Sequence, residues 1–310
     1  MHILVIYTGG ATGPNIEAQL KDYLELQLVA TVDITLLADI AGADVPYSLS
    51  TDIAKTIFNG YHKYDGFVVV HSVDNVLYTA NLLAFQLYPL GKPVIFTGTT
   101  LAEDFFTLPN NNNFSGDEQV MYRKMSLRTS LVTAVQLATQ NVSGVLLAYG
   151  PRIVHAVRAL ESTNTDHIGF TSWQAEDVAT VRFGIELTTN TGQPRQSVSP
   201  ELQAGVDPRV IVLRREPQPD TLIIPPETKA VLMHAYQDQL LPRKLVLPPG
   251  IPCFVLGTQG RLDLPPGMMI IPPSAPTTAL CKLMVGSCHY SGQDLIDFML
   301  MSVTGEGGKV

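Results

Sequence analysis

The feature that most constrains the fold is an apolar run that leads into a glycine-rich turn near the start of the chain. Residues 3–6 read Ile-Leu-Val-Ile, and residues 7–13 continue as Tyr-Thr-Gly-Gly-Ala-Thr-Gly. Open α/β sheets build a ligand site from an apolar strand that feeds a glycine-rich turn and then a helix. We therefore expect residues 3–6 to form a core strand with a binding turn directly behind it.

Similar apolar runs recur along the chain, and helix-like segments separate them. The runs within 65–71, 92–98 and 145–150 lack polar alternation, which is typical of strands that are covered on both faces. The stretches 76–87 and 127–139 have helical patterns. The alternation of the two predicts an α/β fold with a larger doubly wound, mostly parallel sheet.

Later in the chain, further β-rich runs at 210–213, 230–233 and 253–256 are separated by proline-rich loops. They predict a second, smaller α/β domain. The polar segment 108–116 is expected to be an exposed insertion. The domain limits follow from the composition, since the connection is rich in Thr, Gln, Gly, Ser and Pro. We expect an N-terminal domain at 1–187, an interdomain linker at 188–205 and a C-terminal domain at 206–310.

Composition restricts the class of partner and the compartment. The net charge is −8 and Lys and Arg do not cluster, which argues against nucleic acid or an anionic membrane as a partner. No apolar run reaches the roughly 18 residues that a membrane span requires, and the start of the chain does not read as a secretory leader. Three cysteines without a Cys-x-x-Cys pair favour reduced thiols. We expect a cytoplasmic protein.

Several motifs resemble those of one enzyme family. The turn at residues 7–13 is similar to the Tyr-Thr-Gly-Gly-Thr-Ile-Gly turn of L-asparaginases, and residues 64–71 match the strand before the family's second catalytic motif. Residues 90–98 match the family's Leu-Gly-Lys-Pro-Val-Ile-x-Thr-Gly strand almost letter for letter. Residues 257–263 and 277–283 lie where the family has a Gly-Lys/Arg-Val motif and a Thr-x-Glu-Ala-x-x-x-Lys-Leu helix. These matches occur in the same order as in the family. The chain therefore resembles the bacterial cytoplasmic (type I) L-asparaginases over nearly its whole length.

This resemblance implies an asparaginase-like two-domain fold that assembles as dimers or tetramers, with sites at subunit contacts. The implied reaction is hydrolysis of an asparagine side-chain amide by a threonine nucleophile through an acyl-enzyme, without a metal or an organic cofactor. A shared fold does not by itself carry an activity. The activity therefore depends on the residue at each site position.

The position of the family's nucleophile, three residues after Thr8, is occupied by Ala11. A methyl group cannot attack a carbonyl carbon. Thr12 offers a hydroxyl one position later, but near-attack geometry tolerates a displacement of only about 1 Å, and Thr12 also suits a helix N-cap. The family's mobile loop with a lid tyrosine is missing after residue 14, which removes a means of excluding water.

The family's second motif, His-Gly-Thr-Asp-Thr, reads His-Ser-Val-Asp-Asn at residues 71–75. Val73 keeps the branched shape of the relay threonine and loses its hydroxyl. Asp74 remains at the position that binds the substrate's amine, although it could equally cap the following helix. The partner lysine falls at Glu161, or at Ser162 if one residue is skipped, so the positive charge is lost.

Substrate anchoring also differs from the family pattern. The family's Asp-Ser-Ser/Gln-Asp-Met turn corresponds to residues 41–45, so the carboxylate-binding serine becomes Gly42, with Asp44 two residues later. The Gly-x-Gly-Asn loop of the second domain becomes the bulkier residues 235–239. The positions around the expected pocket are Thr8, Ala11, Thr12, Gly42, Asp44, Val73, Asp74 and Glu161.

These losses favour a catalytically inactive asparaginase homologue, a pseudoenzyme that acts as a structural or interaction subunit. A first alternative is a divergent amidohydrolase that uses Thr12, or a water oriented by Asp74, on a small amide. A second alternative is a sensor of amino-acid-type ligands, with Asp44 and Asp74 binding an amine. The expected partner is a second copy of the chain, as a dimer or tetramer, or a larger protein assembly. No nucleic acid, membrane, metal or cofactor is expected.

Overall fold

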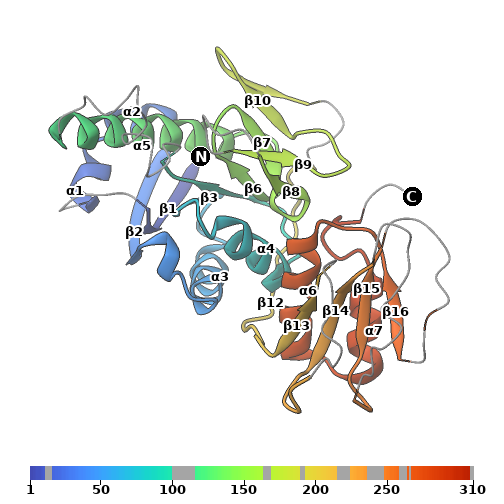
Figure 1. The fold of residues 1–310 in the computed structure, drawn as a ribbon. Coiled ribbons are helices and arrows are strands. Elements are labelled where there is room, and N and C mark those ends of the chain that lie inside the picture. Colours follow the sequence, from blue (N-terminus) through green and yellow to red (C-terminus); the bar gives the residue numbers. More distant parts are fainter. Residues whose placement is uncertain are drawn as a thin grey trace.

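The structure is a computed structural model. It describes residues 1–10, 16–99, 116–162, 169–188, 193–214, 224–235, 248–257, 264 and 267–307, with the backbone alone at 17, 19 and 116–125. An eight-stranded and a four-stranded sheet dominate this part of the chain (Figure 1). Of the segment that we expected to be an exposed insertion, residues 108–115 lie outside the described residues.

The larger sheet has five parallel strands, extended by antiparallel strands on one side. Its order is β11-β10-β7-β6-β5-β3-β1-β2. The parallel strands are β1 (His2–Gly9), β2 (Thr31–Ile40), β3 (Gly66–Val70), β5 (Pro93–Thr97) and β6 (Gly144–Ala148). The antiparallel strands are β7 (Arg152–His155), β10 (Ala179–Val181) and β11 (Ile185–Leu187). The predicted α/β fold with a mostly parallel sheet is confirmed.

Helices cover both faces of this sheet, which explains why its strands are apolar without alternation. Leu4 and Ile6 of β1 join one core with α3 (Ser48–Gly60) and α4 (Val76–Gln86). Ile3 and Val5 join the core on the opposite face of the sheet, which three other helices cover. These are α1 (Ile16–Lys21), α2 (Leu24–Val29) and α5 (Gly116–Ala138). In the described part of the chain, no helix is long and apolar enough to span a membrane.

The smaller sheet is parallel throughout and follows the chain order. Its strands are β13 (Val210–Leu213), β14 (Ala230–His234), β15 (Cys253–Leu256) and β16 (Met268–Ile271). Leu232 and Phe254 pack on one face against Leu283 and Leu295. These two leucines belong to α6 (Pro276–His289) and α7 (Gly292–Leu300). The three later β-rich runs predicted from the sequence are therefore strands of one sheet, and β16 joins them.

Short elements complete the described fold. They are the pair β4 (Leu87–Tyr88) with β12 (Glu201–Leu202), the pair β8 (Ala159–Glu161) with β9 (Phe170–Ser172), and the 3-10 turns η1 (Gly42–Asp44) and η3 (Ala156–Arg158). The connection predicted at 188–205 thus contributes β12, which is hydrogen-bonded to the N-terminal part of the chain.

The two parts of the chain meet where α4 packs against α6 (Figure 1). Asn81 on α4 and Thr278 on α6 are both 0% exposed. The Thr278 hydroxyl lies 2.9 Å from Asn81 Oδ1 and 3.0 Å from the carbonyl oxygen of Val157. The Asn81 amide donates to the carbonyls of Leu77 and Ala156. A satisfied polar network therefore fixes how the two parts meet.

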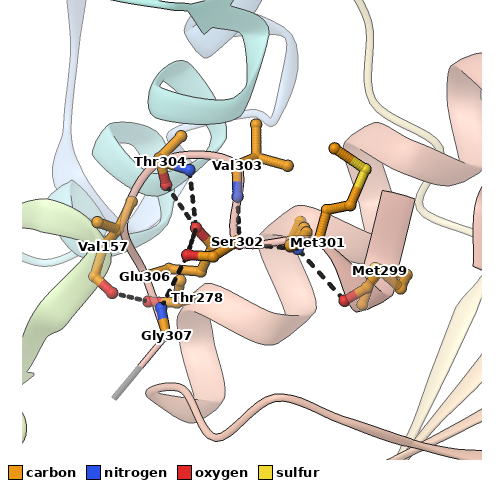
Figure 2. A network of polar contacts seen from close by, with 10 residues as sticks. Val157, Thr278, Met299, Met301, Ser302, Val303, Thr304, Glu306 and Gly307 are labelled. Atoms are coloured by element: carbon orange, nitrogen blue, oxygen red, sulfur yellow. Dashed lines mark hydrogen bonds and ion pairs between the residues drawn. The ribbon is translucent and has the colours of Figure 1, made fainter. Parts of the chain in front are cut away.

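Residues 302–307, the C-terminal strap, are bound to α6 through a buried ion pair. Figure 2 shows the hydrogen bonds that the Ser302 and Thr304 hydroxyls donate to Glu306 within the strap. Lys282 Nζ lies 2.7 Å from Glu306 Oε1, and both residues are 4% exposed. The Glu306 carboxylate also accepts the backbone N–H groups of residues 303 and 304. Arg158 donates to the strap carbonyls of Gly305 and Gly307. The strap therefore contacts both the C-terminal helix α6 and the N-terminal part.

Candidate functional site

The strand order identifies one edge of the larger sheet as the place for a site. From β1 the chain adds β2 on one side, and β3 then pairs with β1 on the other side. In doubly wound sheets, ligands bind at the carboxyl ends of the strands where the order reverses in this way. The switch point lies between β1 and β3, so the residues that follow these two strands are the candidates.

Glycines allow the segments after β1, β2 and β3 to touch through their backbones. Gly10 has φ +78°, and a Cβ added there would lie 2.6 Å from Ser72 Cα. Gly9 has φ +134°, and its added Cβ would overlap the backbone of Ile40 at the end of β2. Only glycine adopts such angles readily and leaves room for such an approach. The glycine-rich turn predicted as a binding turn thus brings three strand ends together.

Thr8 anchors this edge and offers no free hydroxyl. Its side chain is 1% exposed, and its Oγ1 donates to the Val70 carbonyl at the end of β3 over 2.9 Å. A buried hydroxyl that is already hydrogen-bonded to backbone is a packing element. Of the predicted pocket positions, Thr8 therefore serves to hold β1 against β3.

Gly42 and Asp74 are brought into direct contact, with Ser72 between them. The Ser72 hydroxyl donates to Asp74 Oδ2 over 2.9 Å. A Cβ added at Gly42 would overlap both Asp74 Oδ2 and Ser72 Oγ. The Asn75 amide donates to the Gly42 carbonyl and fixes η1 against the segment after β3. Two positions predicted for substrate anchoring are therefore neighbours, but the space between them is filled.

The neighbouring predicted positions have different environments. Val73 is partly buried and packs against the core that contains α3 and α4. Asp74 is exposed and precedes Asn75, the N-cap residue of α4. Asp74 is thus not the N-cap that we considered, and its carboxylate accepts a hydrogen bond from Ser72. Asp44 lies at the end of η1 with an exposed side chain.

His71 and Tyr149 form the buried floor beneath this cluster. His71 is 1% exposed, its Nδ1 contacts the Ser72 carbonyl oxygen, and its Nε2 has no hydrogen-bond partner among the described residues. Because that carbonyl can only accept, a neutral His71 carries its proton on Nδ1. Burial lowers the pKa of His71, which favours the neutral ring. The Tyr149 hydroxyl donates to the His71 carbonyl over 2.8 Å, and burial raises the pKa of Tyr149 well above its ordinary value.

Glu161 stands apart from this cluster. It ends β8 with an exposed side chain. Burial is the main reason for the raised pKa of Tyr78, and the charge of Glu161 is a smaller contribution, which locates Glu161 near α4. Among the described residues, no hydrogen bond or ion pair joins Glu161 to Asp74. The nearby Arg158 is bound to the C-terminal strap.

Ala11 and Thr12 lie outside the described residues, as do residues 236–239 and 258–263 of the second part of the chain. Their expected roles stay predictions. Within the described part, no group of three or more His, Cys, Asp or Glu side chains is arranged to hold a metal ion.

A surface hollow elsewhere does not belong to this cluster. It lies between α1, α2 and β2 and is lined in part by Tyr23, Asp33 and Tyr64. Asp33 already accepts hydrogen bonds from Lys63 at 2.9 Å and from the Tyr64 hydroxyl at 2.7 Å. These bonds hold the pKa of the Asp33 carboxyl far below its usual value. The hollow presents a carboxylate that is already paired, so the switch-point cluster remains the candidate site.

Ser72 is the important residue of the cluster that sequence reasoning did not single out. It stands where the resembling family has a glycine, and Gly42 stands where that family has a serine. Relative to the family pattern, the glycine and the serine have thus exchanged places between positions 42 and 72. Such an exchange is a signal that the two positions are in contact.

Comparison with known proteins finds a family model that matches the N-terminal part and an L-asparaginase that is similar over 70% of the chain. Residues 2–116 match the family model described as "Asparaginase, N-terminal". An L-asparaginase of Thermococcus kodakarensis is 25% identical over 229 residues, which cover 70% of this chain and 64% of that relative, less than two thirds of its length.

Two solved structures have a similar fold. L-asparaginase I from Vibrio cholerae superposes with a TM-score of 0.78 at 22% identity and covers 99% of both chains. A probable cytoplasmic L-asparaginase from Campylobacter jejuni superposes with a TM-score of 0.69 at 17% identity, over 96% of this chain and 99% of that one. At these identities the likeness concerns the fold.

Proposed function

This chain belongs to the asparaginase family, and we propose that it is a catalytically inactive member that acts as a structural or interaction subunit. Inactivity here means the loss of amide hydrolysis through a hydroxyl nucleophile. The relatives are L-asparaginases by name, so the proposal depends on the residues in which this chain departs from the family pattern.

The observation that carries the proposal is the absence of a free hydroxyl at both catalytic positions. Ala11 and Val73 have none. The described hydroxyls nearby are all engaged as donors, Thr8 to Val70, Ser72 to Asp74 and Tyr149 to a backbone carbonyl. A nucleophile needs both a hydroxyl and a nearby group that takes its proton. Buried His71 contacts backbone through Nδ1, and its Nε2, the atom that could take a proton, has no hydroxyl within hydrogen-bond distance among the described residues.

Charge in the cluster also supports the proposal. An oxyanion and a proton relay need positive charge or aimed donors. The described groups around Asp74 are a serine, a neutral histidine and a tyrosine whose pKa is raised. At the position expected for the relay lysine stands Glu161, an anion on an exposed strand end.

We further propose that the protein is cytoplasmic, self-associates as a dimer or tetramer or joins a larger assembly, and divides into domains at 188–205. Free buried thiols at Cys253 and Cys281 fit a reducing compartment. Exposed apolar side chains such as Leu24, Leu28 and Phe183 fit a chain that has contacts with other protein surfaces.

The test is an ammonia-release assay with asparagine and glutamine on protein made in a host that lacks its own asparaginases. We expect no release above a matched blank, even at high protein concentration, and the same result for Thr12→Ala. Turnover by the wild-type chain that Thr12→Ala abolishes would contradict the proposal and assign a divergent amidohydrolase. Native mass measurement on the same sample tests self-association.

A further inference from the structure

Building on the proposed function, we propose that Ser72 is an internal occupant of the amino-acid subsite and closes it to α-amino acid ligands. The subsite is the space between Gly42 and Asp74. Here the hydroxyl of Ser72 takes the place that a ligand's ammonium group would need at Asp74.

The space between Gly42 and Asp74 is already filled. A single added carbon at Gly42 would overlap Asp74 Oδ2 and Ser72 Oγ. Gly42 is buried, and Ser72 is only 9% exposed. A ligand's ammonium group is about the size of the methyl group that this carbon stands for, and its carboxylate is larger, so neither enters between these residues unless a side chain moves.

The Asp74 carboxylate is already hydrogen-bonded on the side of Gly42. A carboxylate binds an ammonium group by accepting its protons. Asp74 Oδ2 already accepts the Ser72 hydroxyl at 2.9 Å. A ligand ammonium that approaches Asp74 Oδ2 from the side of Gly42 would have to displace this bond, which weakens binding there by the strength of the bond that is lost.

The backbone around Ser72 and Gly42 is held in place by its neighbours. The Asn75 amide holds the Gly42 carbonyl, the His71 ring contacts the Ser72 carbonyl, and Gly10 packs against Ser72 Cα. None of these contacts uses the side chain of residue 72, so they persist when that side chain is shortened. Removing the side chain should therefore open the subsite without dismantling it.

The test compares wild type, Ser72→Gly and Ser72→Ala by calorimetric titration and thermal shift with L-aspartate and L-asparagine. We expect no saturable binding to the wild type. For Ser72→Gly we expect a rise in Tm that saturates with ligand. Its Kd should be lower, on the order of tenfold or more, than the weakest Kd that the titration of the wild type could have detected. Ser72→Ala removes the hydroxyl and keeps the Cβ, so its gain should be smaller. A Ser72→Gly protein that folds but binds no better than wild type overturns the proposal.

A double-mutant cycle tests the same contact without a ligand. Gly42→Ala should lower the Tm of the wild type, and lower it less in the Ser72→Ala background, where the hydroxyl is gone and Asp74 is released. Equal losses in both backgrounds would overturn the proposal even if Ser72→Gly does not fold. Hydrolysis by the wild type bears on the proposed function alone, whereas these measurements bear on Ser72.

Discussion

Asn81 and Thr278 are single buried polar residues on which the contact between α4 and α6 depends. Both are 0% exposed, and the Thr278 hydroxyl lies within 3.0 Å of acceptors on two other elements. A buried polar group that loses its partner costs more than the hydrogen bond itself contributes. These residues therefore fix the geometry of the contact as well as its stability.

Replacing Thr278 with valine keeps the shape of the side chain and removes the hydroxyl. Asn81 Oδ1 and the Val157 carbonyl then lose a partner, and we expect a loss of about 1–3 kcal/mol in the free energy of unfolding. Urea denaturation measures it. Thr56→Val, which removes an exposed hydroxyl bonded within its own helix, is the control and should cost less than about 0.5 kcal/mol. Equal costs for the two variants would contradict this role of Thr278.

Glu306→Gln breaks the buried ion pair with Lys282. The variant leaves a 4%-exposed ammonium without its anion, so we expect a loss of about 3–5 kcal/mol near neutral pH. Lys282→Met with Glu306→Gln removes both charges and should recover part of that loss. Chemical denaturation of the wild type and the two variants checks both expectations. A double variant less stable than Glu306→Gln alone would count against a coupled pair.

The same carboxylate predicts a pH dependence. Burial alone would raise the pKa of Glu306, but Lys282 and the hydrogen bonds it receives outweigh burial and hold the pKa below the ordinary 4.5. A depressed folded pKa stabilises the protein above pH 4.5 and the gain is lost as pH falls through the folded value. The stability gap between wild type and Glu306→Gln should therefore narrow from about pH 7 to about pH 3.5. A difference in stability between wild type and Glu306→Gln that does not change with pH would contradict a lowered pKa of Glu306.

At the scale of elements, the strands that the sequence predicts are those covered on both faces. β3 and β5 are buried at every residue, so their apolar runs are continuous and visible in the sequence. The strands β10 and β11 have three residues each, too few to establish any period. They form because β7 offers a free antiparallel edge, which is a property of the assembled sheet.

The packing of α6 on α7 depends on a glycine. A Cβ at Gly286 would lie 2.8 Å from Phe298 Cδ1 and 3.0 Å from Leu295 Cδ1. We expect Gly286→Val to cost about 1–3 kcal/mol through overpacking, despite the removal of a helical glycine. Thermal unfolding measures the effect. Leu300→Ala, at the 43%-exposed end of α7, is the control, and a loss as large as that of Gly286→Val would contradict the packing argument.

At the scale of the whole molecule, the candidate site is predictable in its location and much less in its geometry. The glycine-rich turn and the strand order locate it, since both follow from local patterns. The contact of Gly42 with Asp74 depends on how far η1 approaches the segment after β3. That approach depends on sheet register and on Asn75, and neither is visible in a single residue. Ser72 acquires its role only from this contact.

The C-terminal strap joins the two parts of the chain at a second place, apart from the contact of α4 with α6. Its Glu306 is buried against Lys282 of α6, and its carbonyls accept hydrogen bonds from Arg158 of the N-terminal part. Two independent contacts should make the parts unfold together. A chain shortened after Met301 loses one contact completely, while a chain shortened after Gly307 keeps it.

We therefore expect the chain shortened after Met301 to unfold in two separate calorimetric transitions, because the buried Lys282 loses its anion and Arg158 loses its acceptors. The chain shortened after Gly307 and the full chain should each unfold in one transition. Arg158→Gln keeps the ion pair and removes only the link to the N-terminal part, so it should separate the transitions with a smaller loss in Tm. A single transition in all three shortened or substituted chains would show that the contact of α4 with α6 is sufficient to couple the two parts.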